Sequence, residues 1–118
     1  MVHKMTLWND PFDSIKSGMK TVEMRLNDEK RQSINVGDTL SFTNVKTNEV
    51  INVLVIEKVI YKDFYELYKH YDKISIGYKE DEIADPKDML MYYSQEKIDK
   101  YGALAIKIKL MKWYYVCN

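Results

Sequence analysis

Four polar residues within one short stretch, KTVEMR, carry side chains that could act together on a ligand: Lys20, Thr21, Glu23 and Arg25. Arg25 offers a planar fork of donors for a carboxylate, a phosphate or the edge of a base. Lys20 is a point charge that becomes a base or a nucleophile only when it is desolvated. A nearby Glu23 favours the charged amine, so we expect it to hold Lys20 and Arg25 or to accept from a ligand N–H. This chemistry fits binding better than nucleophilic catalysis.

Alternation of side chains along this stretch predicts a strand with two different faces. Apolar residues at positions 22, 24 and 26 should face the core. Thr21, Glu23 and Arg25 fall on the other face, where an ordinary solvated surface and a functional site both fit the pattern. Lys20 has the wrong parity to join that face in a regular strand. It reaches the same side only if the strand begins there with a twist or bulge, which a glycine just upstream permits.

Aromatic residues add one further candidate. Trp8 stands at the end of a predicted first strand and is the aromatic residue best placed to border the strand that holds Lys20. A structural role and a ligand contact both fit this position. The ten tyrosines resemble a stacking surface for bases, yet Tyr68 and Tyr71 lie on the apolar face of a predicted helix, so we expect most tyrosines to belong to the core.

Histidine and cysteine do not form a recognisable metal site in the sequence. His3 and His70 lie far apart without the spacing of metal ligands. The single cysteine, Cys117, can form neither an intrachain disulfide nor a cysteine-based zinc site. We therefore expect no metal and no cofactor.

Composition indicates one globular domain over residues 1–118. Hydrophobic residues make up 46% of the chain and charged residues 31%, and no stretch has the low complexity of a linker. The longest strongly apolar run, residues 53–56, is far too short to span a membrane, and the N-terminal residues lack the apolar centre of a signal peptide. We therefore expect a cytoplasmic protein without a membrane partner.

The charges of the chain balance. Eighteen basic and eighteen acidic side chains give a formal net charge of zero, which removes the broad positive field that drives non-specific binding to nucleic acid. An anionic ligand must therefore be held by a local patch.

The pattern along the chain predicts strands joined by short helices. Two Asp-Pro-x-Asp stretches, residues 10–13 and 85–88, each predict a helix that an Asp caps and in which Pro fills the first position. Asp63 begins another helix with a capping-box pattern, Ser94 can cap a further short turn, and residues 77–84 form a polar connection. Predicted strands lie at residues 3–8, 20–25, 39–42, 50–61 and 104–110.

The long strand at residues 50–61, VINVLVIEKVIY, is rich in β-branched residues and largely apolar on both faces. This is typical of a strand in a closed or covered sheet, so Val53, Val55 and Ile56 should belong to the core. The last strand alternates apolar with small or charged residues, which predicts half-burial. Together these elements predict an α+β domain built as a small, mostly antiparallel β-barrel with short peripheral helices.

The stretch LWNDPFDSIKSGMKTVEMRLNDEKRQSINVGDTLSF resembles the N-terminal half of an ASCH domain, the family named for its homology to activating signal cointegrator. Pro-Phe before a helix, Gly-x-Lys-Thr-x-Glu-x-Arg, and Gly-Asp before a strand occur here in the family's order. The stretch ADPKDMLMYYSQEKIDKYG also resembles the small bacterial members, which leaves only the tail KWYYVCN without a counterpart. The resemblance implies a fold similar to the PUA domain.

By this resemblance, Lys20, Thr21, Glu23 and Arg25 match the motif that lines the cleft of the family. The resemblance implies that this cleft binds RNA or a small nucleotide-like ligand such as a modified nucleoside. Trp8, as the neighbouring aromatic residue, joins these four as a candidate ligand contact.

Two alternatives stay open. One branch of small ASCH-like proteins hydrolyses acetylcytidine with a lysine, a threonine three residues later, and a glutamate farther along. Lys20 matches the lysine, but Glu23 holds the place of the threonine and Thr21 stands elsewhere in the motif. If the chain is such an amidohydrolase, Lys20 and Glu23 are its catalytic candidates, with Thr21 or a water as the attacking group. The other alternative is a protein-interaction module, which the zero net charge permits.

Overall fold

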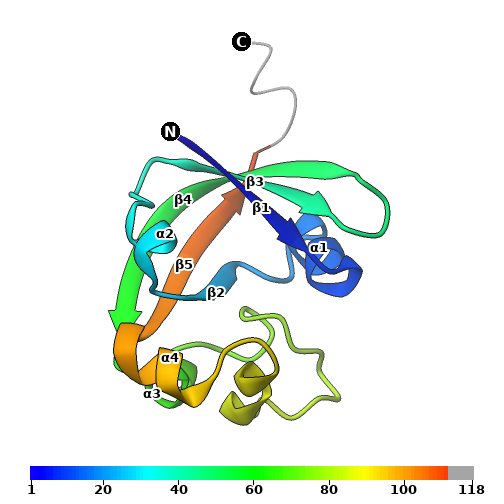
Figure 1. Cartoon of the computed structure of the whole chain (residues 1–118). Coiled ribbons are helices and arrows are strands. Elements are labelled where there is room, and N and C mark those ends of the chain that lie inside the picture. Colours follow the sequence, from blue (N-terminus) through cyan, green and yellow to red (C-terminus); the bar gives the residue numbers. More distant parts are fainter. Residues whose placement is uncertain (112–118) are drawn as a thin grey trace.

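The structure, a computed structural model, describes residues 1–111 as a curled sheet with short helices around it (Figure 1). Cys117 and the rest of the tail lie outside the described residues. The α+β class and the mostly antiparallel sheet that the sequence predicts are confirmed. The elements are β1 (Val2–Leu7), α1 (Asn9–Lys16), β2 (Val22–Leu26), α2 (Glu29–Gln32), β3 (Thr39–Asn44), β4 (Val50–Tyr61), α3 (Phe64–Tyr68), the 3₁₀ helix η1 (Pro86–Met91), α4 (Gln95–Tyr101) and β5 (Ala103–Leu110).

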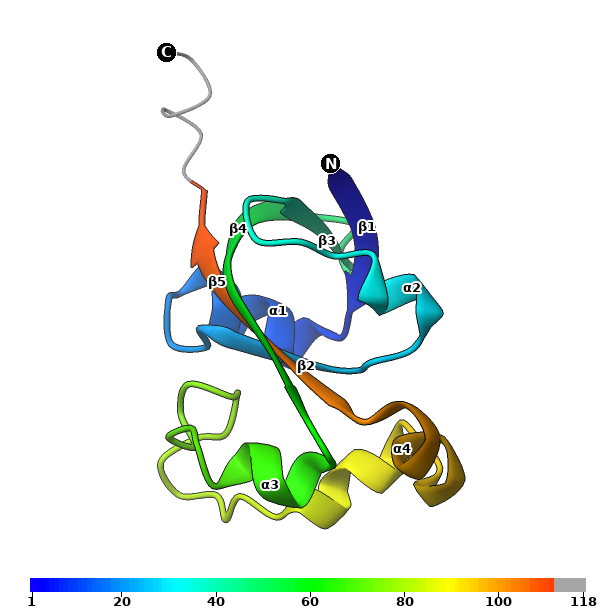
Figure 2. The same ribbon diagram turned by 90° about the vertical axis from the view of Figure 1, so that its left-hand side faces the viewer.

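The strands follow the order β1-β3-β4-β5-β2, so β1 and β2 are the two edges of the sheet. β1 pairs in parallel with β3, and the other neighbours pair antiparallel. The sheet curls into a half-barrel (Figure 2). A guanidinium nitrogen of Arg25 in β2 donates to the backbone carbonyl of Thr6 in β1 at 3.2 Å. One side chain thus links the two edge strands.

The long strand β4 changes register in its middle, and this corrects one prediction. Val53 and Val55 are fully buried, as expected, but Ile56 is 41% exposed. The pairing of β4 with β5 shifts between Val55 and Glu57, where Ile56 is the extra residue of a bulge. Because the bulge interrupts the alternation of faces, the expectation that Ile56 belongs to the core was wrong.

Short polar side chains start most of the helices, with one exception. Asp63, Asp85 and Ser94 each accept a hydrogen bond from a backbone N–H in the first turn of α3, η1 and α4. The element after Asp85 is a 3₁₀ helix. At α1 the residue in the capping position is Trp8, which makes no side-chain cap bond, and Asp10 lies inside the first turn. The expected cap at Asp10 was therefore wrong, although its charge still favours the positive end of the helix dipole.

The hydrophobic core has two parts that share β5. The first is enclosed by the half-barrel and α1 and includes the fully buried Phe12 and Phe42. The second joins α3 and α4 to β2 and β5, and includes Phe64. Leu104 of β5 belongs to the first part and its neighbour Ala103 to the second, so this strand is buried on both faces near its start. The predicted half-burial therefore holds only for its later residues.

The helical layer of α3, η1 and α4 lies beside one end of the half-barrel (Figure 2). The second core holds this layer against β2 and β5. None of the helices within residues 1–111 is long and apolar enough to cross a membrane.

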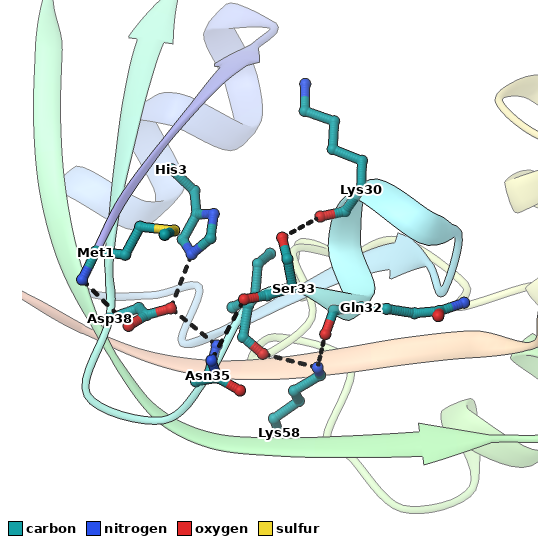
Figure 3. Close-up of polar contacts among 9 residues, drawn as sticks. Met1, His3, Lys30, Gln32, Ser33, Asn35, Asp38 and Lys58 are labelled. Carbon is teal, nitrogen blue, oxygen red and sulfur yellow. Dashed lines mark hydrogen bonds and ion pairs between the residues drawn. The ribbon is translucent and has the colours of Figure 1, made fainter.

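A group of polar contacts fixes the beginning of β1 (Figure 3). The carboxylate of Asp38 lies 3.3 Å from the N-terminal amine and 2.8 Å from Nε2 of His3. The same carboxylate accepts from the backbone N–H of Asn35, which closes the turn before β3. Nearby, Nζ of Lys58 donates to the carbonyls of Gln32 and Ile34, at 3.1 and 2.7 Å. The contacts of Asp38 therefore fix the start of β1, and those of Lys58 fix the segment after α2 against β4.

The bulge in β4 yields a test by paired substitutions. Val55→Ala should lower the free energy of unfolding by about 2 to 3 kcal/mol, because it leaves a cavity in the first core. Ile56→Ala should lower it by less than about 1 kcal/mol, because the side chain is already partly in water. Urea unfolding of both variants beside the wild type measures the difference. Equal losses would show that β4 has no bulge at Ile56.

Candidate binding cleft

Three charged side chains of the predicted motif converge in the structure. Nζ of Lys20 lies 2.7 Å from Oε1 of Glu23. Nε and Nη2 of Arg25 lie 2.9 and 2.8 Å from Oε2 of Glu23. Each carboxylate oxygen of Glu23 therefore binds one of the two basic groups, and the lysine and the guanidinium are held side by side.

The carboxylate at the centre of this group is almost inaccessible to water. Glu23 is 2% exposed and Lys20 is 8% exposed. Burial alone would raise the pKa of Glu23, but the charges of Lys20 and Arg25 and their hydrogen bonds lower it from 4.5 to about 2. Burial likewise opposes the charge of Arg25, and Glu23 more than offsets this, so the pKa of Arg25 is raised. Both buried cations need the ionised carboxylate of Glu23, because without it their charges would have no partner to offset desolvation.

Contacts outside β2 explain how Lys20 joins residues of opposite parity. Lys20 precedes the strand, and its backbone N–H donates to the carbonyl of Ser14 in α1 at 3.0 Å. The carbonyl of Ser75 accepts from the next two backbone N–H groups, each at 2.9 Å. The loop that holds Ser75 also brings Gly77 against the lysine: a Cβ at Gly77 would lie 3.2 Å from Cδ of Lys20, and the φ of Gly77 is +111°. Only glycine suits both conditions.

These charged groups form part of the wall of a cleft of about 670 Å³. The other walls come from residues 6–14 at the end of β1 and in α1, and from residues 68–93 in the helical layer. Trp8, Lys20, Glu23 and Arg25 all line the cleft, so the structure brings four of the five predicted site residues together. Thr21 is not among the lining residues, and its backbone N–H and carbonyl bind Ser75 and Ile108.

Two exposed aromatic residues border the cleft. Trp8 is 66% exposed and Tyr92 is 59% exposed, and they come from different segments of the lining, residues 6–14 and 68–93. Exposed aromatic faces at the mouth of a polar cleft are suitable surfaces for stacking a flat ligand. Sequence analysis selected Trp8 and missed Tyr92, although the unusual pair Tyr92-Tyr93 directly after an Asp-capped helix was a visible signal.

A chain of hydroxyl and carboxyl groups belongs to the part of the cleft lining that residues 68–93 contribute. The hydroxyls of Tyr68 and Tyr78 lie 2.9 Å apart, and the hydroxyl of Tyr78 donates to Oδ2 of Asp88 at 2.8 Å. Burial raises the pKa of both tyrosines, so both hydroxyls keep their protons near neutral pH. Tyr68, which sequence analysis assigned to the core, packs against the second core and also lines the cleft. Tyr78 was missed because the stretch 77–84 has the composition of a plain polar connection, and Asp88 was missed because the Asp-Pro-x-Asp pattern at residues 85–88 was interpreted only as the start of a helix.

The charges along the cleft nearly cancel. Its acidic residues outnumber its basic ones by one, with Asp10, Glu23, Glu82 and Asp88 against Lys20, Arg25 and Lys79. Since the two innermost cations are already paired with Glu23, the cleft offers little net positive field to a chain of phosphates. Within residues 1–111, no three His, Cys, Asp or Glu side chains are grouped to hold a metal ion.

The chain is similar to a known family along most of its length. The sequence model of the ASCH domain matches residues 5–112. No curated protein sequence matches the chain.

Three solved structures have a similar fold. The hypothetical protein PH0355, known from a crystal structure, is 27% identical with a TM-score of 0.80, over 94% of this chain and 100% of that one. The protein PF0455 from Pyrococcus furiosus, solved by NMR, is 30% identical with a TM-score of 0.75, over 96% of this chain and 100% of that one. The ASCH protein from Zymomonas mobilis is 15% identical with a TM-score of 0.65, over 92% of this chain and 66% of that one, and shows a similar fold.

The buried carboxylate makes stability depend on pH in a defined range. Because the pKa of Glu23 is lowered from 4.5 to about 2, its ionisation stabilises the fold above pH 4.5, and this contribution is lost as the pH falls toward 2. The full loss corresponds to about 3 kcal/mol. Urea unfolding at a series of pH values should show a smaller loss over this range in Glu23→Gln, after comparison of both proteins at pH 7. Equal pH profiles would contradict the burial of an ionised Glu23.

Proposed function

This chain belongs to the ASCH domain family, and from this membership we propose that it binds RNA or a modified nucleoside in the cleft lined by Lys20, Glu23 and Arg25. The observation that carries the proposal is the convergence of these three groups beside two exposed aromatic residues in one concave site. Sites of this kind, with few fixed polar groups and apolar or aromatic walls, are where small ligands bind.

The size and lining of the cleft suit a base with its sugar. Its volume of about 670 Å³ lies in the range of small-molecule sites. Stacking on Trp8 or Tyr92 accommodates any base, because every base has a flat face. Proteins that recognise RNA by sequence act mostly on unpaired bases that can enter such pockets.

The near-neutral lining favours a ligand bound mainly through its base. Arg25 uses two nitrogens on Glu23 and one of these also on Thr6, so little of its fork is left for a phosphate. Short single-stranded RNA should therefore bind through one or two bases with few phosphate contacts, and a free nucleoside should retain most of the affinity.

The geometry supports binding more than amide hydrolysis. A lysine general base must be free to take a proton from a nucleophile within hydrogen-bond reach. Here the ammonium of Lys20 lies 2.7 Å from a buried carboxylate, and the hydroxyl of Thr21 belongs to a residue outside the cleft lining. The competing amidohydrolase hypothesis therefore needs a rearrangement of Glu23 before chemistry begins.

Trp8 provides a direct test of binding in the cleft. Trp8→Ala should weaken the binding of a nucleoside or a short single-stranded RNA about tenfold, because stacking on an aromatic residue contributes about 1 to 3 kcal/mol per base. The matched control is Tyr65→Ala, since Tyr65 is also an exposed aromatic residue, at 48%, and does not line the cleft. Isothermal titration calorimetry measures both affinities. Equal losses in the two variants would place binding elsewhere, and no binding of RNA or nucleosides by the wild type would favour a protein-interaction module.

Turnover of acetylcytidine separates the binding protein from the enzyme. The purified protein should release no cytidine from acetylcytidine above the rate without protein, because Glu23 occupies both the position and the contact that a nucleophile would need. Chromatography of timed samples measures the product, with Lys20→Ala as the control. Turnover by the wild type that disappears in Lys20→Ala would make Lys20 catalytic and would refute the binding proposal.

A further inference from the structure

We propose that the cleft selects an aromatic heterocycle that carries an amino group, and that the carboxylate of Asp88 accepts a hydrogen bond from that amino group. The inference rests on the proposed function and adds to it the chemical class of the ligand. It starts from the chain of groups formed by Tyr68, Tyr78 and Asp88, which the Lys20 motif does not include.

Among the carboxylates of the cleft, Asp88 combines a free acceptor with a position held by a side chain, Tyr78, that packs against the second core. Both oxygens of Glu23 are occupied by buried cations. Oε1 of Glu82 accepts from the backbone N–H of Lys79, and although the other oxygen of Glu82 is free in the described part of the chain, both residues are exposed in an irregular loop. The side chain of Asp10 makes no hydrogen bond within residues 1–111 that would fix its carboxylate. Oδ2 of Asp88 is held by Tyr78, whereas its Oδ1 makes no hydrogen bond within residues 1–111. Asp88 is exposed toward the cleft, so this oxygen can meet a ligand.

The hydrogen bonds of Tyr78 show that Asp88 is oriented as an acceptor. An ionised carboxylate only accepts, so the hydroxyl of Tyr78 must be the donor toward Asp88. The backbone carbonyl of Asp85, 3.1 Å from the same hydroxyl, is also only an acceptor. The one hydroxyl proton of Tyr78 is thus committed, and Tyr68 is left to donate to Tyr78. Tyr78 is therefore a positioning residue, and the acceptor it orients is Asp88.

A fixed carboxylate distinguishes ligands that offer a hydrogen-bond donor from ligands that offer an acceptor. The amino groups of cytosine and adenine donate, whereas uracil and hypoxanthine present a carbonyl oxygen at the corresponding position. A carbonyl placed beside Asp88 would bring two acceptors together and leave both without a partner. Because Asp88 is exposed and water can compensate in part, we expect a preference of about tenfold for the amino-bearing base.

The test compares matched ligand pairs on the full chain by isothermal titration calorimetry. Cytidine is compared with uridine, and adenosine with inosine, since in each pair a carbonyl replaces the amino group and the adjacent ring nitrogen gains a proton. In the wild type we expect at least one amino-bearing nucleoside to bind about tenfold more tightly than its partner. In Asp88→Asn the preference should fall to near unity, because the amide can donate as well as accept. Asp81→Asn removes an exposed charge from the loop that precedes η1, outside the cleft lining, and should leave the preference unchanged.

Tyr78→Phe supplies an independent variant that keeps the carboxylate but frees it to rotate. It should reduce the preference while both members of a pair still bind, which a purely structural tyrosine would not do. Wild-type protein that binds both members of each pair equally would overturn the inference and leave the proposed function intact. An unchanged preference in both Asp88→Asn and Tyr78→Phe would overturn the assignment to Asp88. Failure to bind any of the four nucleosides and single-stranded RNA would overturn the proposed function together with the inference.

Discussion

The two ion pairs of the buried Glu23 are the interaction on which the rest of the site depends. Lys20 and Arg25 could not both lie in a wall that excludes water without an ionised partner between them. Glu23 orients Arg25 so that it can donate to the carbonyl of Thr6. Glu23 also holds Lys20 where the loop at Gly77 packs against the aliphatic part of the lysine side chain. The same carboxylate therefore joins the half-barrel, α1 and the helical layer around one cleft.

The cleft joins two walls of different character. One is built on β2 and α1, where regular backbone and buried ion pairs keep the groups fixed. The other belongs to the helical layer, where a short 3₁₀ helix and an irregular loop hold tyrosine hydroxyls and a carboxylate in place. The two walls therefore have different roles. The first provides a polar surface that is the same for every ligand, and the second provides the acceptor that distinguishes one ligand from another.

Local patterns explain most of what could be predicted from the sequence, and long-range contacts explain what could not. The caps at Asp63 and Ser94 and the strands of the sheet depend on neighbouring residues, so they could be inferred. The bulge at Ile56 depends on the pairing of β4 with β5, about fifty residues away along the chain. The position of Lys20 depends on Ser75 and Gly77, and the contact of Tyr78 with Asp88 crosses a loop without periodicity. No window of neighbouring residues contains that information.

The bond from Arg25 to Thr6 has a consequence for how copies of the chain behave in solution. An open sheet presents unpaired N–H and C=O groups on its two outermost strands, and such strands can recruit strands of other molecules into fibres. Here the short strand β2 and the first strand β1 are turned toward each other, and a guanidinium occupies one of the carbonyls that an incoming strand would need. The side chain that shapes the cleft thus also protects a half-closed barrel against edge-to-edge aggregation.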